Sequence, residues 1–88
     1  MSYRHIELEV RRSVGWYRFN RPPRNAVDWE MLAELAPAFE DLLARPDVKV
    51  ITVASAIEGY FSTGADIAAF RGVGSDRMRE WVASTHRL

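Results

Sequence analysis

The segment FSTGADIAAF at residues 61–70 places three residues with distinct backbone chemistry side by side: Gly64, Ala65 and Asp66. One interpretation is local structure, because glycine adopts backbone angles that other residues avoid and aspartate is a preferred N-cap, here of a short helix at 67–71. The other interpretation is that the loop presents backbone N–H groups to a ligand, which small side chains allow to approach closely. The segment alone leaves both interpretations open.

A second polar segment, NRPPRNA at residues 20–26, precedes a strongly periodic region. Two consecutive prolines exclude both a helix and a central strand there, so we expect an exposed loop that carries Arg21, Arg24 and Asn25. A pair of carboxylates elsewhere is a weaker candidate. Glu7 and Glu9 alternate with apolar residues along a predicted strand, and we interpret them as solvent-facing.

The composition excludes several kinds of site. The chain has 88 residues, of which 48% are hydrophobic, and it has no cysteine, so we expect neither a disulfide nor a cysteine-based zinc site. The two histidines are far apart in the sequence, and we expect no bound metal. Twelve basic residues balance twelve acidic residues, so no overall field favours nucleic acid or an anionic membrane. Because signal-peptide and membrane-span patterns are also lacking, we expect a cytoplasmic protein.

Periodicity predicts the elements that must position the two loops. Alternating residues predict a half-buried strand at 5–10, and VGWYRF at 14–19 predicts a second strand, antiparallel to the first through a short hairpin. Apolar residues at three- and four-residue spacing predict a helix at 29–44, with Asp28 as its N-cap. A strand follows at 48–54, and its apolar faces predict burial on both sides. This order implies a right-handed crossover and parallel pairing.

The predicted fold class is therefore α/β, and FSTGADIAAF lies at the carboxyl end of the sheet, where such proteins bind ligands. Pro37 lies inside the predicted helix and should bend it, because proline removes a backbone hydrogen bond. We expect a last helix from Ser75 or Asp76, whose apolar residues find few partners in a chain of this length. Residues 1–88 are therefore expected to form an incomplete part of a longer domain. The stripe of this helix consists of Met78, Trp81, Val82, Thr85 and Leu88.

The motifs NRPPRNAVD before the helix and GYFSTGADIAAF after the strand, in this order, resemble the N-terminal third of the enoyl-CoA hydratase/isomerase (crotonase) superfamily. The resemblance covers nearly the whole chain. It implies a crotonase-like ββα spiral, of which these residues would form the N-terminal portion. It also implies acyl-CoA thioester substrates, with coenzyme A as part of the substrate and no separate cofactor, and assembly into a homotrimer or hexamer.

The same resemblance implies roles for residues of both motifs. The backbone N–H of Ala65 would donate to the thioester oxygen as the first oxyanion-hole donor. Arg24 would contact a phosphate of CoA, although Arg21 and Arg24 could equally do no more than solvate the loop. Asp66 is interpreted mainly as a helix cap. The residues implied to border CoA are Arg24, Asn25, Ala26, Thr63, Gly64, Asp66 and Ile67.

The family's second oxyanion donor and its catalytic acids would lie beyond this chain, and neither Glu58 nor Glu80 matches them. Two functions of different class remain open. The first is part of an enzyme of the enoyl-CoA hydratase/isomerase type, a lyase or an isomerase, with a C-terminal remainder of the same protein as its partner. The second is a catalytically inert acyl-CoA-binding or assembly module.

Overall fold

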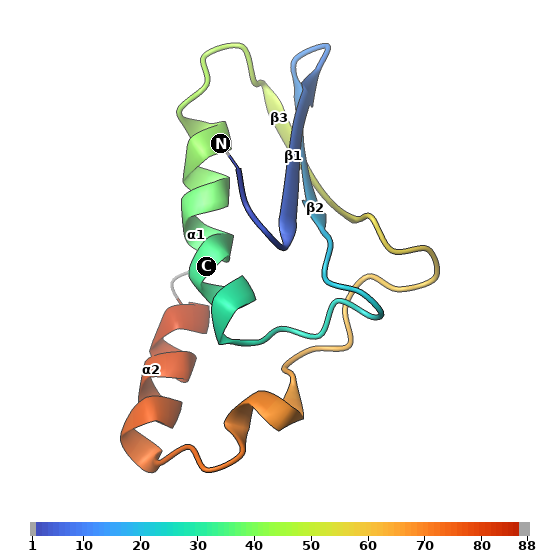
Figure 1. Ribbon diagram of the computed structural model, residues 1–88. Coiled ribbons are helices and arrows are strands. Elements are labelled where there is room, and N and C mark those ends of the chain that lie inside the picture. The colour runs from blue at the N-terminus through green and yellow to red at the C-terminus, as the bar shows by residue number, and fades with distance from the viewer. Residues whose placement is uncertain (1, 87–88) are drawn as a thin grey trace.

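The computed structural model describes residues 2–86, except for the side chains of Ile67 and His86. Within this range a mixed sheet has the strand order β1-β2-β3, formed by β1 (Ile6–Arg11), β2 (Val14–Phe19) and β3 (Val50–Ser55). β1 and β2 pair antiparallel, whereas β2 and β3 pair parallel, as Figure 1 shows. The predicted hairpin and the predicted parallel pairing are both confirmed.

A two-residue turn joins β1 to β2. Arg12 and Ser13 have φ angles of 51° and 69°, and two consecutive positive φ angles are typical of the type I′ turn, which suits the twist of a hairpin. The turn fixes a register in which Leu8 lies opposite Tyr17 and Val10 opposite Gly15. Ile6, Leu8 and Val10 of β1 therefore share one face of the sheet with Tyr17 and Phe19 of β2.

The helix α1 (Trp29–Leu43) packs against that face. It begins where the sequence predicts, because the Asp28 side chain accepts a hydrogen bond from the backbone N–H of Met31 at 2.8 Å. Leu43 is its last residue and Ala44 is the C-cap, one residue short of the predicted end. Pro37 lies inside α1 on its exposed side, and the predicted bend there stays a prediction.

The core lies between α1 and the sheet and extends to Trp29, the first residue of α1, where Trp81 packs. Tyr17 is buried, and its hydroxyl donates to the backbone carbonyl of Leu35 at 2.6 Å. Burial raises the pKa of this hydroxyl far above its usual value. Gly15 allows Leu42 of α1 to pack closely on the sheet, because a Cβ there would lie 3.2 Å from a methyl group of Leu42. The buried hydrophobic residues are Ile6, Tyr17, Met31, Leu32, Leu35, Ala38, Leu42 and Trp81.

The third strand differs from its prediction. It runs from Val50 to Ser55 and is not buried on both faces, since Val50 is 57% exposed and Val53 is 44% exposed. The physical reason is its place in the sheet: among the described residues, β3 pairs with β2 alone and forms the sheet's edge. An apolar strand sequence predicts the potential for burial, and burial itself requires neighbouring segments.

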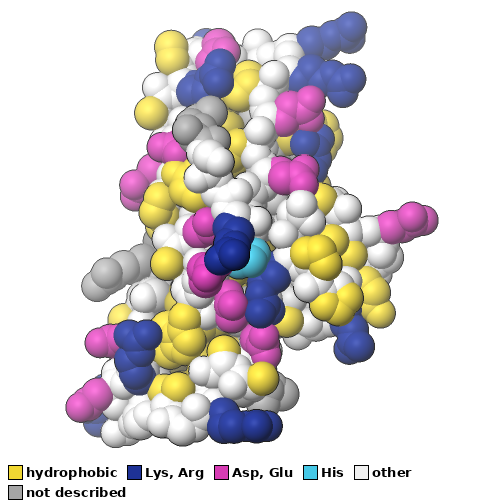
Figure 2. All heavy atoms as spheres, viewed as in Figure 1, with side chains coloured by type: hydrophobic (Ala, Val, Ile, Leu, Met, Phe, Trp, Pro, Cys, Tyr) yellow, Lys and Arg dark blue, Asp and Glu magenta, His cyan; other side chains and the backbone are white. Residues whose placement is uncertain are grey.

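Acidic residues of α1 hold the segment that precedes β1. The Glu34 carboxylate accepts the backbone N–H groups of Arg4 and His5 at 2.7 and 2.8 Å. Glu30 pairs with the side chains of the same two residues, and the Tyr3 hydroxyl donates to Asp41. The segment before β1 is thus ion-paired with α1, and Figure 2 shows acidic and basic side chains close together over this face.

The last part of the chain consists of a 3₁₀ helix, η1 (Ile67–Phe70), and the helix α2 (Ser75–His86). Trp81 of α2 is only 7% exposed, which corrects the expectation that it finds few partners. Its ring lies edge-on to Trp29 and to Phe70, with centroid distances of 4.9 and 4.6 Å. Val82 remains 47% exposed, and Leu88 lies outside the described residues.

Candidate functional site

The two motifs predicted to act together lie side by side in the structure. Val27 and Ala65 form a parallel β-bridge, although 38 positions separate them. The Val27 N–H donates to the Gly64 carbonyl, and the Asp66 N–H donates to the Val27 carbonyl, both at 2.7 Å. The loop after the Pro-Pro pair and the loop after β3 are therefore joined by backbone hydrogen bonds.

This bridge determines where the Ala65 peptide group points. Val27 bonds to the residues on both sides of Ala65, so by the alternation of an extended strand the N–H of Ala65 points away from Val27. Ala65 is exposed, and no hydrogen bond within residues 2–86 uses its N–H. The N–H is thus available to an acceptor outside the described chain.

The local interpretation of FSTGADIAAF describes real features, and the ligand-donor interpretation stays a prediction. Gly64 has a φ of +89°, a value that side chains other than that of glycine rarely adopt. Asp66 caps η1, since its carboxylate accepts the Ala68 N–H at 3.1 Å. The local interpretation is therefore confirmed, and it leaves the N–H between these two residues exposed.

Asn25 is completely buried, which corrects the prediction that the whole 20–26 loop is exposed. Its side-chain amide donates to the Ser55 hydroxyl at 2.8 Å and to the Phe61 carbonyl at 2.9 Å, and its oxygen accepts the Arg21 N–H at 2.8 Å. Its φ is +57°, a conformation that asparagine tolerates better than most residues. Its predicted contact with CoA stays a prediction, and its side chain anchors the loop to the end of β3.

A hollow of about 260 Å³ opens beside the joined loops. Its lining includes four of the predicted CoA-bordering residues, and Asp66 contributes its only carboxylate. Arg24 is exposed there and lies in no ion pair of the described chain, whereas Arg21 pairs with Asp28 and Asp66. The lining residues are Arg21, Pro22, Pro23, Arg24, Ala26, Thr63 and Asp66.

The remaining predicted site residues lie next to this hollow without lining it. Gly64 and Ala65 are exposed on the same loop, and the backbone of Ile67 begins η1. The side chain of Ile67 lies outside the described part of the structure. The structure therefore brings the predicted site segments together, and their binding roles stay predictions.

Sequence reasoning missed the role of Arg21. Its Nη1 donates to the Ala26 carbonyl at 2.8 Å and to Asp66 at 3.0 Å, and its Nη2 lies 3.1 Å from Asp28. A signal was present, because one arginine and two predicted N-cap aspartates flank the two loops. Their distance in the sequence concealed the contact.

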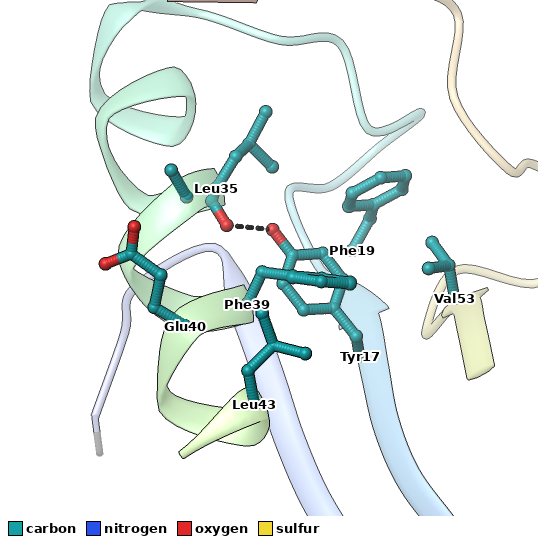
Figure 3. A pocket seen from close by; sticks show the side chains of 8 residues that line it. Tyr17, Phe19, Leu35, Phe39, Glu40, Leu43 and Val53 are labelled. Carbon is teal, nitrogen blue, oxygen red and sulfur yellow. Dashed lines mark hydrogen bonds between the residues drawn. The ribbon is translucent and has the colours of Figure 1, made fainter. Parts of the chain in front are cut away.

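A larger hollow, of about 440 Å³, lies between α1 and the sheet and is shown in Figure 3. Its walls are almost entirely apolar, and Glu40 is the one ionisable carboxyl group among them. None of its lining residues belongs to the two motifs, so its size does not make it the site of chemistry. The lining residues are Tyr17, Phe19, Leu35, Ala36, Phe39, Glu40, Leu43 and Val53.

Other carboxylates are paired away from this loop. Glu9 pairs with Arg18 at 2.8 Å, and Glu80 pairs with Arg77 at 2.6 Å, while Glu58 is exposed. In the described range, no group of three metal-ligating side chains comes together, and no helix has the length and apolar character needed to cross a bilayer. The candidate site is therefore a backbone donor beside a hollow with one exposed cation.

The sequence of this chain is similar to known proteins of one family. A sequence profile described as enoyl-CoA hydratase/isomerase matches residues 9–84. A glyoxysomal fatty acid beta-oxidation multifunctional protein, MFP-a, of Brassica napus is 39% identical over 59 residues. The peroxisomal fatty acid beta-oxidation multifunctional protein MFP2 of Arabidopsis thaliana is 36% identical over 59 residues. Each match covers 67% of this chain and 8% of the relative.

Solved structures agree. An enoyl-CoA hydratase/isomerase from Xanthobacter autotrophicus Py2 is 34% identical with a TM-score of 0.84, over 94% of this chain and 32% of that chain. An enoyl-CoA hydratase from Geobacillus kaustophilus HTA426, at 23% identity, shares the fold with a TM-score of 0.87, over 96% of this chain and 32% of that one. This chain thus spans about a third of the solved structures, and it has the α/β crotonase fold over that part. The chain belongs to the enoyl-CoA hydratase/isomerase family.

Proposed function

We propose that this chain takes part in acyl-CoA thioester chemistry of the enoyl-CoA hydratase/isomerase type, and that the Ala65 N–H is the first oxyanion-hole donor. The observation that carries the proposal is the Val27–Ala65 bridge, which leaves this N–H exposed and fixed between two backbone hydrogen bonds. Family membership supports the thioester substrate class. The structure of the loop supports the choice of donor.

The chemistry explains why a fixed N–H is useful. When a nucleophile adds to the β-carbon of an enoyl thioester, or a proton leaves the α-carbon, negative charge develops on the thioester oxygen. A donor that is already oriented stabilises this charge without reorganisation, and loss of one such donor typically lowers the rate about 100- to 1,000-fold. The positive φ of Gly64 and the cap at Asp66 hold the Ala65 N–H in one orientation.

The hollow beside the loop supports a surface for CoA. Arg24 is its exposed cation, and cations bind phosphate groups through charge-assisted hydrogen bonds. Ala26 and Thr63 form adjacent wall positions and leave room because their side chains are small. We propose that Arg24 contacts a CoA phosphate and that the residues of the two loops border the rest of the CoA moiety.

We further propose that a complete site requires a partner segment, such as a C-terminal remainder of the same protein, and assembly into a trimer or hexamer. Two observations support this. Among residues 2–86, Asp66 is the only carboxylate that lines the hollow, and Arg21 already pairs with it, so this part of the chain places no free acid there to move a proton. The apolar hollow and the unpaired edge of β3 offer a surface for further strands of the fold.

A specific observation also favours the second candidate function, a catalytically inert acyl-CoA-binding or assembly module. General acid-base catalysis typically contributes about 100- to 10,000-fold, and the described chain brings no suitable acid to Ala65. We therefore expect the 88-residue chain alone to show no hydration of crotonyl-CoA. Robust turnover by this chain alone would contradict the requirement for a partner segment.

The test of the donor compares Ala65→Pro with Ala65→Ser in a protein that contains this chain and turns over crotonyl-CoA. Proline removes the N–H, whereas serine keeps it with a small side chain, so only Ala65→Pro should lower kcat, by about 100-fold or more. Circular dichroism of both variants checks the fold. Equal turnover by the two folded variants would remove Ala65 from the mechanism.

A further inference from the structure

Arg21 contacts the N-cap residues of two helices, and these two residues lie in different loops. Asp28 caps α1 with one carboxylate oxygen, which accepts the Met31 N–H, and its other oxygen lies 3.1 Å from Arg21 Nη2. Asp66 caps η1 in the same way: one oxygen accepts the Ala68 N–H, and the other lies 3.0 Å from Arg21 Nη1. Each aspartate thus divides its carboxylate between a helix terminus and the same guanidinium.

We infer that Arg21 is a positioning residue that holds the Ala65 N–H in its donor orientation; this inference rests on the proposed function of Ala65. Asp66 directly follows Ala65, so the residue after the donor is tied to Arg21 through its side chain. The Asp66 N–H is tied to Val27 through the backbone. The loop is therefore restrained at Asp66 by two independent contacts with the 20–28 segment.

A third contact makes the restraint rigid. Arg21 Nη1 also donates to the Ala26 carbonyl at 2.8 Å, so the guanidinium is fixed to the backbone next to Val27. Its planar fork can reach three acceptors at once, which a lysine ammonium on a flexible stem does less well. The side chain is 25% exposed, and its carboxylate partners are 23% and 24% exposed, so solvent competes only partly for these contacts.

The same contacts separate Arg21 from Arg24 in function. Two carboxylates already compensate the single positive charge of Arg21, which leaves little net attraction for a phosphate. Arg24 is exposed and lies outside the described ion pairs. The two arginines of one loop therefore have different tasks, since one orients the donor loop and the other faces the ligand.

The first test measures the amide of Ala65 by ¹⁵N relaxation in the 88-residue chain and compares wild type with Arg21→Gln. We expect the order parameters of Gly64, Ala65 and Asp66 to fall in this variant while those of β1, β2 and α1 stay unchanged. Asp66→Asn is the second variant, because asparagine can still cap η1 but cannot pair with the guanidinium. Arg11→Gln is the matched control, since Arg11 is exposed and distant from the loop in the sequence.

Unchanged order at Ala65 in both variants would overturn the inference. Arg21→Lys sharpens the test, because it keeps the charge and removes the planar fork. We expect it to restore the order of the loop only in part, and full restoration would contradict a role that depends on the guanidinium geometry.

A second readout reports the donor's effect on substrate. The infrared band of the thioester carbonyl of crotonyl-CoA should move to lower wavenumber when crotonyl-CoA binds to a protein that contains this chain. The reason is that the Ala65 N–H polarises the carbonyl. Arg21→Gln should lose most of this shift, a larger loss than any fall in its affinity for CoA without an acyl group. A merely structural role in folding would weaken both together.

Ala65→Pro distinguishes the two ways to fail. If this variant keeps the full carbonyl shift that the wild-type protein gives, the proposed function of Ala65 is wrong, and the relaxation data alone decide the role of Arg21 in ordering the loop. If Ala65→Pro abolishes the shift and Arg21→Gln does not, Ala65 remains the donor and the positioning inference is wrong.

Discussion

The hollow beside Ala65 and the apolar hollow between α1 and the sheet are built on different physical terms. Hydrogen bonds and ion pairs of Arg21, Asn25 and Asp66 hold the walls of the first. Aromatic and aliphatic side chains form the second, and Phe39, Leu43 and Val53 on its rim are 36%, 63% and 44% exposed. Contacts within the chain thus fix the polar hollow, whereas the rim of the apolar hollow is exposed in residues 2–86.

This difference separates preorganisation from burial. A donor can be oriented by a few directional contacts between short segments, even where much of the surface is wet. Burial of apolar side chains is not directional and requires enough neighbouring surface. The part of the fold present here therefore supplies an ordered loop and leaves an apolar face uncovered.

The largest expected effect comes from Asn25, the buried residue behind the polar hollow. Asn25→Ala removes three side-chain hydrogen bonds and forces alanine to a φ of +57°, so the free energy of unfolding should fall by about 3–5 kcal/mol. Urea denaturation monitored by tryptophan fluorescence measures this change. Asn25→Gly is the control, because glycine tolerates the positive φ and should recover part of the loss. A loss below about 1 kcal/mol for Asn25→Ala would show that the loop is not anchored as described.

A smaller effect is expected at the floor of the apolar hollow. Tyr17→Phe keeps the ring and removes the hydroxyl that donates to the Leu35 carbonyl, so unfolding should become easier by about 0.5–1.5 kcal/mol. Thermal and urea denaturation measure this loss. Removal of the hydroxyl from Tyr60, which is 45% exposed, provides the control and should change stability little. Equal effects of the two changes would mean that the buried hydrogen bond contributes nothing specific.

The rim of the apolar hollow should tolerate charge. Leu43 is 63% exposed, so Leu43→Lys should alter the free energy of unfolding by no more than about 0.5 kcal/mol. The same change should reduce binding of a hydrophobic dye and self-association in sedimentation experiments, because the uncovered apolar surface shrinks. A large loss of stability would show that Leu43 already packs within the chain. Unchanged dye binding would show that the dye binds an apolar surface other than this rim.

The smallest effect concerns the charged contacts of the segment that precedes β1. A hydrogen bond from Arg4, with a further contribution from His5, lowers the pKa of Glu30 below its usual value of 4.5. A lowered pKa in the folded state means that the contribution to stability is present above the usual pKa and is lost as the pH falls through the folded-state pKa. Glu30→Gln should therefore be slightly destabilising near pH 7 and neutral at low pH. Denaturation curves at the two pH values test this, and an effect that grows in acid would reverse the assigned sign.

Sequence reasoning predicted the parts of the molecule that depend on local pattern. The bounds of β2, the N-cap at Asp28 and the cap at Asp66 follow from residue type and periodicity, which act over a few positions. The likeness of two ordered motifs to a known family placed the two loops at one site. These features need no knowledge of distant contacts.

Several features that depend on distant contacts were missed, although the parallel pairing of β2 and β3 was not. The burial of Asn25 and the bridge from Arg21 to Asp66 join residues up to 45 positions apart, and nothing local to either loop shows them. The burial of β3 was predicted too strongly, because an apolar sequence does not reveal which neighbours are present. The buried position of Trp81 depends on two aromatic partners outside α2.

The glycines of this chain differ in a way that only the backbone reveals. A Cβ at Gly15 would meet Val48 and Leu42 at 3.1 and 3.2 Å, whereas at Gly64 it would meet nothing within 4 Å. A side chain at Gly15 would therefore require Val48 and Leu42 to shift. Gly64 is required for its positive φ, which a mirror-image amino acid adopts as readily as ordinary residues adopt negative values. The loop that carries Ala65 is thus constrained by chirality, while the contact of helix and sheet is constrained by space.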